Sequence, residues 1–219
     1  MKSFRAVVNP HRAEQVIRRS RFIGWTVPAQ DEDVFEKVLL EIRQELPGAT
    51  HYCYGGIIGG GRNGVAVERF SDDGEPSGTA GRTILEVVRR RGLVETVVVV
   101  VRYFGGVLLG AAGLARAYSG TAALVLDGAV IGAFRLCQLW KLTIPYGLWG
   151  MVQSLLQTTS LSDGWSPEIA AVEYGAEVYV QLVVPREDAG RFAAYLTDKT
   201  AGSVVPVVLG EDWRSRSDV

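Results

Sequence analysis

The sequence contains few of the residues that form disulfide bonds in small secreted proteins or bind metal ions in metalloproteins. Its 219 residues include only two cysteines and two histidines. Two cysteines cannot form the disulfide framework that holds small secreted domains together, and so few soft ligands exclude a structural zinc site. We therefore expect a cytoplasmic protein that carries no cofactor.

Long apolar runs and an excess of one charge are also missing. The longest purely apolar run, residues 97–101, is far too short to span a bilayer, and residues 1–5 lack the apolar stretch of a signal peptide. A net charge of −1 argues against a protein that simply coats nucleic acid. Residues 1–135 carry 17 basic and 14 acidic side chains, whereas residues 136–219 carry 6 and 10. This division permits a basic patch in the first half.

What the sequence does contain is enough apolar material for a globular core, with 47% hydrophobic residues and a mean hydropathy of +0.14. Apolar spacing predicts helices over residues 31–46 and 110–126 and from near Thr83 to residue 91. Thr83 and Glu86 fit a capping box at the start of that last helix. Strands are predicted over residues 4–8, 14–27, 50–61, 65–70 and 95–103.

The second half repeats a different order of elements. Strands are predicted over residues 135–144, 169–174, 177–184 and 204–209, with helices over residues 148–156 and 187–199. This β-α-β-β-α-β order is that of a ferredoxin-like sandwich. We therefore predict an α+β protein with two domains, residues 1–133 and 134–210, followed by a flexible tail, residues 211–219. The first domain is expected to be a mixed sheet with helices on one face.

One loop concentrates residues that cannot build a core. Its glycines and following helix start suggest an anion site, but the spacing is not that of a nucleotide P-loop. Asp72, Asp73 and Glu75 could hold Mg²⁺, although no metal site is predicted because adjacent loop acids are more often solvated. The alternative is that these residues only cap turns and bend the chain. The loop residues predicted to bind a ligand are Ser71, Asp72, Asp73, Gly74, Glu75, Ser77, Gly78, Thr79, Gly81 and Arg82.

Two further clusters carry candidate chemistry. His51 and Cys53 lie two apart on one predicted strand, so both side chains point to the same face. With Asp73 and Glu75 they are the candidate catalytic residues of an enzyme, and a half-buried histidine beside a core cysteine is the alternative. The central strand ends in a second set of predicted ligand-binding residues, Arg102, Tyr103, Gly105 and Gly106, joined by Arg116 of the next helix.

Several blocks together resemble the IMPACT/YigZ family. They are Ser20-Arg21-Phe22-Ile23-Gly24, Ala49-Thr50-His51-x-Cys53, the loop from Ser71 to Gly81, Arg102-Tyr103-Phe104-Gly105-Gly106, and Gly113-Leu114-x-Arg116-Ala117-Tyr118. Tyr52, Thr83 and Ala112 depart from the usual family pattern, which has Asn, Pro and Gly at these positions.

The resemblance implies a first domain like the second domain of a small-subunit ribosomal protein, and a second domain like the last domain of elongation factor G. It implies a role linked to translation, with RNA, the ribosome or a protein of the translation apparatus as partner, and no sequence readout of DNA. Three functions stay open: binding of RNA or a phosphate-bearing ligand through residues 71–82, an enzyme of unknown, hydrolase-like reaction, and a protein-partner adaptor in translational regulation.

Overall fold

The computed structural model describes residues 3–217, and the chain divides into two compact units. Unit 1 contains residues 3–134 and 215–217, and unit 2 contains residues 135–214. None of the helices in residues 3–217 is both long enough and apolar enough to cross a membrane.

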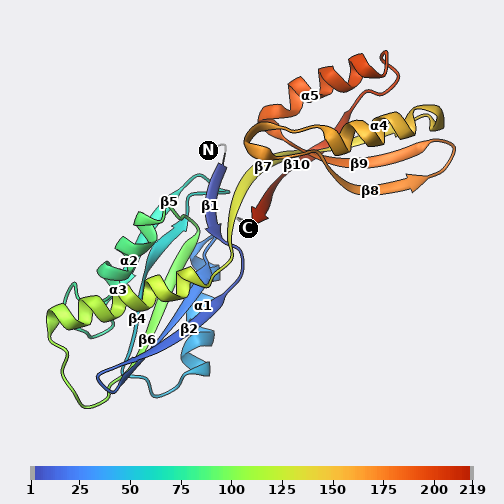
Figure 1. Cartoon of the computed structure of the whole chain (residues 1–219). Helices are drawn as coiled ribbons and strands as arrows, with labels where there is room; N and C mark the ends of the chain where they lie inside the picture. Colours follow the sequence, from blue (N-terminus) through green and yellow to red (C-terminus); the bar gives the residue numbers. More distant parts are fainter. Residues whose placement is uncertain (1–2, 218–219) are drawn as a thin grey trace. The chain divides into compact units, whose positions relative to one another are not determined.

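Unit 1 is built on a five-stranded sheet with the order β2-β3-β6-β4-β5 (Figure 1). Every neighbouring pair in it is antiparallel, so the expectation of a mixed sheet was wrong. The strands are β2 (His11–Ile17), β3 (Ser20–Pro28), β4 (His51–Gly59), β5 (Ala66–Ser71) and β6 (Thr96–Tyr103). A further strand, β1 (Ser3–Val7), pairs with β7 (Ile131–Ile144).

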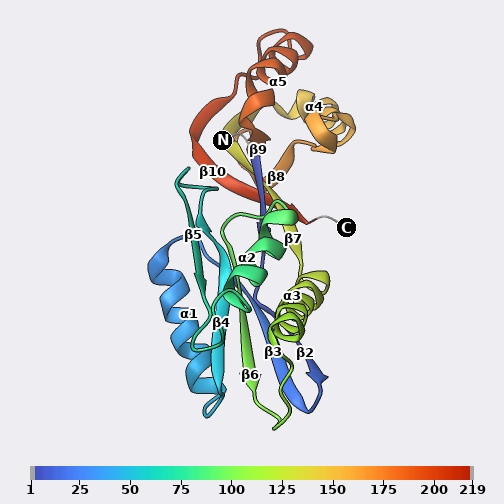
Figure 2. The same ribbon diagram turned by 90° about the vertical axis from the view of Figure 1, so that its left-hand side faces the viewer.

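Helices cover both faces of this sheet, not one as expected (Figures 1 and 2). The five consecutive valines of β6 explain why, because alternate side chains point to opposite faces. Val97, Val99 and Val101 pack with α1 (Glu32–Glu45), while Val98 and Val100 pack with α2 (Gly81–Arg90) and α3 (Ala111–Asp127). A central strand buried on both faces requires cover on both sides.

The segment predicted as one strand over residues 14–27 is a hairpin of β2 and β3. Arg18 and Arg19 form its turn, with φ angles of 43° and 66°. These are left-handed conformations, which bulky residues adopt rarely. The usual turn residues, Gly and Asn, are absent here, so no local pattern marks the break.

Unit 2 has the strand order of the ferredoxin-like sandwich. β7 pairs with β9 (Val178–Pro185) and β10 (Val207–Ser217), and β9 pairs with β8 (Glu168–Tyr174). Two helices, α4 (Tyr146–Thr158) and α5 (Arg186–Lys199), and a 3-10 turn, η1 (Ser162–Gly164), complete it. Trp140 of β7 stacks on Phe192 of α5 within the core, with ring centroids 5.9 Å apart.

The predicted flexible tail was wrong over most of its length. β10 continues as a strand to Ser217 and pairs with β7, whereas the last strand was expected to end at residue 209. Its polar sequence is that of a strand with exposed side chains, and such a strand is held by backbone pairing more than by burial. Residues 218–219 lie outside the described part of the chain. β7 likewise begins at Ile131, earlier than the expected residue 135.

Candidate functional site

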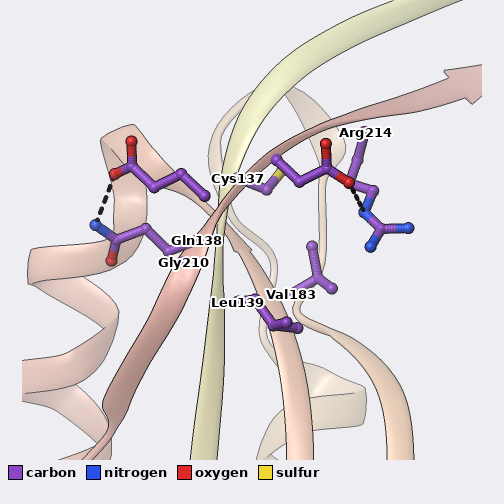
Figure 3. Close-up of a pocket in the computed structure, with 8 residues that line it drawn as sticks. Cys137, Gln138, Leu139, Val183, Gly210 and Arg214 are labelled. Carbon is purple, nitrogen blue, oxygen red and sulfur yellow. Dashed lines mark hydrogen bonds and ion pairs between the residues drawn. The ribbon is translucent and has the colours of Figure 1, made fainter.

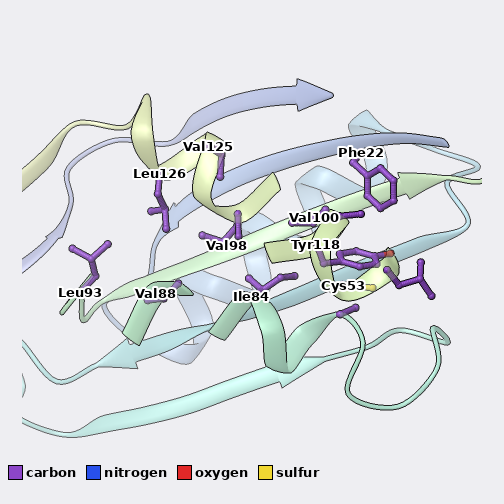
Figure 4. Packing of buried hydrophobic residues seen from close by; sticks show 14 of the residues in the cluster. Phe22, Cys53, Ile84, Val88, Leu93, Val98, Val100, Tyr118, Val125 and Leu126 are labelled. Atoms are coloured by element: carbon purple, nitrogen blue, oxygen red, sulfur yellow. The ribbon is translucent and has the colours of Figure 1, made fainter. Parts of the chain in front are cut away.

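The site is built on one row of residues that crosses three adjacent strands of unit 1. His51 of β4 is the register partner of Arg102 of β6, and Arg102 is the partner of Phe22 of β3. Directly opposed residues on neighbouring strands share a face, so these three side chains lie together. Cys53 follows two residues later on β4, and its register partner is Val100. This face carries α2 and α3 (Figure 4).

Glu75, Arg102 and Tyr118 form a buried hydrogen-bonded group. Arg102 Nη1 donates to Glu75 Oε1 over 2.6 Å, and the Tyr118 hydroxyl donates to the same oxygen over 2.7 Å. The arginine and glutamate side chains are 5% and 3% exposed. Burying a charge is costly unless it is paired, so each of these two ions requires the other. Glu75 is therefore held in place from two elements, β6 and α3.

Arg102 also organises the loop that follows its strand. Its Nη2 donates to the Ser20 hydroxyl, and the backbone N–H of Gly105 donates to that hydroxyl oxygen as well, each over 3.2 Å. At Gly105 a Cβ atom would lie only 2.1 Å from the backbone of Arg19. The loop can approach the β2–β3 turn this closely only with glycine at that position.

His51 is oriented by the loop that carries Glu75. Its Nδ1 lies 2.8 Å from the Asp73 carbonyl oxygen. Because a carbonyl oxygen only accepts hydrogen bonds, Nδ1 carries the proton, and in the neutral ring Nε2 presents a lone pair. Nε2 lies 3.8 Å from Glu75 Oε1. The structure thus brings His51, Asp73 and Glu75 together, although Asp73 contributes its backbone carbonyl to the histidine and not its carboxylate.

The start of α2 is occupied by a carboxylate of the chain itself. Asp72 Oδ1 accepts from the backbone N–H groups of Ala80 and Gly81, and Oδ2 accepts from that of Gly78, over 2.8–3.0 Å. The helix begins at Gly81, and the capping box expected at Thr83 does not form, since Thr83 donates to the Ala80 carbonyl instead. A phosphate expected at this helix start would compete with Asp72, so the structure does not support that part of the prediction.

The neighbouring acid, Asp73, forms hydrogen bonds with residues outside the loop. Asp73, at φ 41°, accepts the backbone N–H of Tyr52 at Oδ2 and an Arg43 Nη2 at Oδ1, over 2.6 and 3.0 Å. Its own N–H donates to the Ser71 hydroxyl. Residues 3–217 contain no group of three or more acidic, histidine or cysteine side chains placed to share a metal ion. The carboxylates of residues 72 and 73 thus hold the loop in shape.

Cys53 lies beneath the site and is unsuited to act as a nucleophile. Its side chain is fully buried and its Sγ donates to the Asp72 carbonyl over 3.0 Å. Burial raises the pKa of the thiol to about 12. Burial also raises the pKa of the Tyr118 hydroxyl. A thiol that keeps its proton reacts slowly, so the cysteine-based enzyme has no support here.

A pocket of about 380 Å³ opens above the row of residues. His51, Glu75 and Arg102 contribute its polar part, and the remaining lining is largely apolar. Phe104 at its edge is 45% exposed. The rest of the lining is Thr50, Pro76, Leu108, Leu109, Gly110, Ala111 and Leu114. A concave, mainly apolar site with a few convergent polar groups is the usual form of a ligand pocket.

Not every predicted residue reaches this pocket. Tyr103 points to the opposite face of the sheet, where its hydroxyl donates to the Pro47 carbonyl. Strand alternation requires this, because its neighbour Arg102 faces the pocket. Arg82 and Arg116 are exposed on α2 and α3. Residues with a backbone or turn role and no place in the pocket lining are Ser71, Asp72, Gly74, Ser77, Gly78, Thr79, Gly81, Gly105 and Gly106.

Sequence reasoning assigned no role to several residues that complete the site. Ser20 and Tyr118 are buried hydroxyls that hold Arg102 and Glu75. Both stand in blocks that carried the family resemblance, but a hydroxyl alone indicates no partner. Leu109 and Leu114 line the pocket, and their apolar character indicated only packing in a core.

Unit 2 has a smaller pocket of about 140 Å³ against its sheet (Figure 3). Polar side chains around it are paired with each other: Gln138 donates to Glu211, and Arg214 lies 3.5 Å from Asp212. Burial raises the pKa of the Cys137 thiol, which lines this pocket, to about 11. Its size and internal pairing do not indicate a ligand.

Fold and site together define a two-unit α+β protein with a ligand-sized pocket over the sheet of its first unit. The Impact N-terminal domain family matches residues 18–126. An IMPACT family member of Haemophilus influenzae is 34% identical, covering 90% of this chain and 92% of that protein. YigZ of Escherichia coli, an IMPACT family member, is 30% identical over 96% of this chain and 100% of its own. The chain belongs to the IMPACT family.

A solved structure supports the same fold. The crystal structure of a hypothetical protein matches with a TM-score of 0.60 and 29% sequence identity, covering 97% of this chain and 100% of that one.

Proposed function

We propose that this protein binds single-stranded RNA at the pocket end of unit 1. The observation that carries the proposal is a set of exposed arginines at that end which have no partner in the described part of the chain. They are Arg18 and Arg19 in the β2–β3 turn, Arg82 in the first turn of α2, and Arg116 on α3.

These arginines are exceptions within unit 1. Most others there form ion pairs, as Arg12 does with Glu45 and Arg43 with Asp73. A paired arginine must give up its partner before it can contact a phosphate, whereas an unpaired one releases only solvent and counterions. The free arginines are therefore the side chains best placed to contact an RNA backbone.

The neighbourhood of these arginines fits the same ligand. Gly105 brings the loop after β6 against the backbone of Arg19. The pocket lining continues along this loop into the first turn of α3. Phe104 lies half exposed at the pocket edge. Cations that follow a backbone next to an exposed aromatic ring are the usual elements of a single-strand binding surface.

The loop of residues 71–82 has a different role in this proposal from the one expected. It supplies Glu75 and Pro76 to the pocket, and its last residue, Arg82, is exposed in the first turn of α2, while its remaining polar groups hold its own shape. The domain resemblances to a ribosomal protein and to elongation factor G, expected from the sequence motifs, favour RNA of the translation apparatus as the natural ligand.

The test is the affinity of the full chain for a fluorescein-labelled U10 RNA, measured by fluorescence anisotropy at 50 mM salt. Replacing Arg18 and Arg19 together by alanine, or Arg116 alone, should weaken binding about three- to tenfold for each phosphate interaction that the variant removes.

Two matched controls are exposed and unpaired but lie elsewhere. Arg90 stands at the far end of α2, near the start of β6, and Lys37 lies on α1 across the sheet. Arg90→Ala and Lys37→Ala should leave the affinity within twofold. If the Arg18/Arg19 and Arg116 variants weakened RNA binding no more than the controls, only the overall charge of the protein would determine the affinity. Absence of binding to any RNA would favour the protein-partner adaptor.

A further inference from the structure

We propose that the pocket of unit 1 holds one guanine base of the bound strand, an inference that rests on the proposed RNA binding. It concerns the polar floor of the pocket, which is formed by His51, Glu75 and Arg102. The RNA proposal concerns the exposed arginines. The two can therefore fail separately.

The floor of the pocket offers hydrogen-bond acceptors. Glu75 Oε1 already accepts from Arg102 and Tyr118, but Oε2 accepts no hydrogen bond from residues 3–217. In the neutral His51 ring Nε2 presents a lone pair, because Nδ1 donates its proton to the Asp73 carbonyl. A second acceptor therefore lies next to the carboxylate, with 3.8 Å between Nε2 and Oε1. Two neighbouring acceptors call for a ligand with two neighbouring donors.

Guanine meets this requirement better than the other bases. Its Watson–Crick edge carries two adjacent donors, N1–H and the N2 amino group. Uracil has one N–H between two carbonyl oxygens, which a carboxylate repels. Adenine and cytosine each place a single amino donor beside a ring-nitrogen acceptor. The carboxylate therefore selects guanine by attraction and excludes uracil by repulsion.

The pocket can accept this base without placing an uncompensated negative charge beside the RNA. Arg102 neutralises Glu75, with its guanidinium 5.3 Å from the centre of the Phe104 ring. Phe104, Leu109 and Leu114 provide apolar walls for the faces of a planar ring. Bases removed from a stack are commonly held against aromatic or apolar side chains in this way.

Arg102 has a further property that separates the site from an ordinary core ion pair. Its Nε–H is buried and makes no hydrogen bond among the described residues. A buried donor without a hydrogen-bond partner is costly, and nearly all buried polar groups avoid this cost. The other hydrogen bonds of Arg102, to Glu75 and Ser20, fix the orientation of its guanidinium beside the pocket.

The experiment compares three labelled RNAs on the wild-type full chain: U10, the same strand with one central guanosine, and the same strand with inosine in that place. Inosine lacks only the N2 amino group of guanosine. One bidentate base contact corresponds to about tenfold in affinity, so the guanosine strand should bind about tenfold tighter than U10. The inosine strand should lose most of that gain.

Each outcome decides one of the two proposals. If no strand binds, the RNA proposal fails and this inference falls with it. If all three strands bind equally, RNA binding stands and the guanine pocket is overturned. If guanosine and inosine strands bind equally more tightly than U10, pairing to the two acceptors is overturned, since stacking alone then explains the gain.

Two variants extend the test. Glu75→Gln keeps the shape of the side chain but replaces one acceptor by an amide donor, so the preference for guanosine over U10 should disappear. Lys141→Ala in unit 2 is the control and should change neither affinity nor preference. Should Glu75→Gln fail to fold, the comparison with inosine decides the question on wild-type protein alone.

Discussion

At the scale of single residues, the buried pair of Glu75 and Arg102 determines the site. Breaking such a pair leaves one uncompensated charge in the interior, which costs about 3–5 kcal/mol. Glu75→Ala should reduce the free energy of unfolding by about that amount, and Tyr118→Phe by about 1–2 kcal/mol because one hydrogen bond is removed. Urea denaturation followed by circular dichroism measures both.

The matched control is Glu86→Ala on the surface of α2. Glu86 pairs with Arg89, and both side chains are about 40% exposed, so solvent screens this pair and it contributes little to stability. If Glu75→Ala were no more destabilising than Glu86→Ala, the buried pair could not be what holds the loop against the sheet.

Because of the buried Cys53 thiol, the free energy of unfolding should depend on pH in the alkaline range. Its pKa in the folded protein is raised to about 12, so above its ordinary pKa the unfolded chain releases a proton that the folded chain retains. The stabilising contribution is complete below the ordinary pKa of the thiol and is lost as pH rises toward 12. The loss amounts to about 1.4 kcal/mol for each pH unit.

The comparison that isolates this effect is wild type against Cys53→Ala from pH 8.5 to 10.5. The wild-type protein should lose stability more steeply, because the contributions of Cys137 and the tyrosines are common to both proteins. Parallel stability profiles over this range would show that the Cys53 thiol titrates alike in the folded and unfolded chains.

At the scale of elements, α2 begins where Asp72 accepts its free N–H groups. Asp72→Ala should remove about 2 kcal/mol of stability and speed hydrogen exchange at the amides of Ala80 and Gly81, as the loss of a helix cap does. Thr83→Ala is the control and should cost less than about 1 kcal/mol. If Thr83→Ala were more destabilising than Asp72→Ala, the capping box that the sequence suggested at Thr83 would be the true N-terminus of α2.

Most elements could be predicted because their apolar spacing is regular. α1, α3, β6 and the ferredoxin-like order of unit 2 all have clear helical or strand periods. The breaks were harder to predict. A turn made of Arg18 and Arg19 has no turn signature, and a helix cap supplied from eight residues upstream by Asp72 has no local pattern.

The site could be predicted only in part for a related reason. Strand alternation placed His51 and Cys53 on one face, but only the strand register adds Arg102 and Phe22 to that row. The loop sequence suggested that its acids act together. In the fold, Asp72, Asp73 and Glu75 point to three different partners, and which one reaches the pocket depends on a backbone turn with positive φ at residues 73 and 74.

At the scale of the whole molecule, the two units differ in net charge. Residues 3–134 and 215–217 carry 16 basic and 14 acidic side chains, a net +2, and residues 135–214 carry 6 and 9, a net −3. If RNA binds, this difference in net charge favours unit 1 over unit 2 as its site. The RNA proposal attributes binding energy to phosphate contacts at the rim, and such contacts depend strongly on salt.

The most direct test of the RNA proposal is the salt dependence of U10 binding by the wild-type chain between 50 and 200 mM. For a single strand the logarithm of the affinity falls by about 0.7 per phosphate contact for each unit of the logarithm of salt concentration. Contacts from Arg18, Arg19, Arg82 and Arg116 predict a slope of about −3 by the same relation. A slope near zero, or no binding at 50 mM salt, would contradict the account.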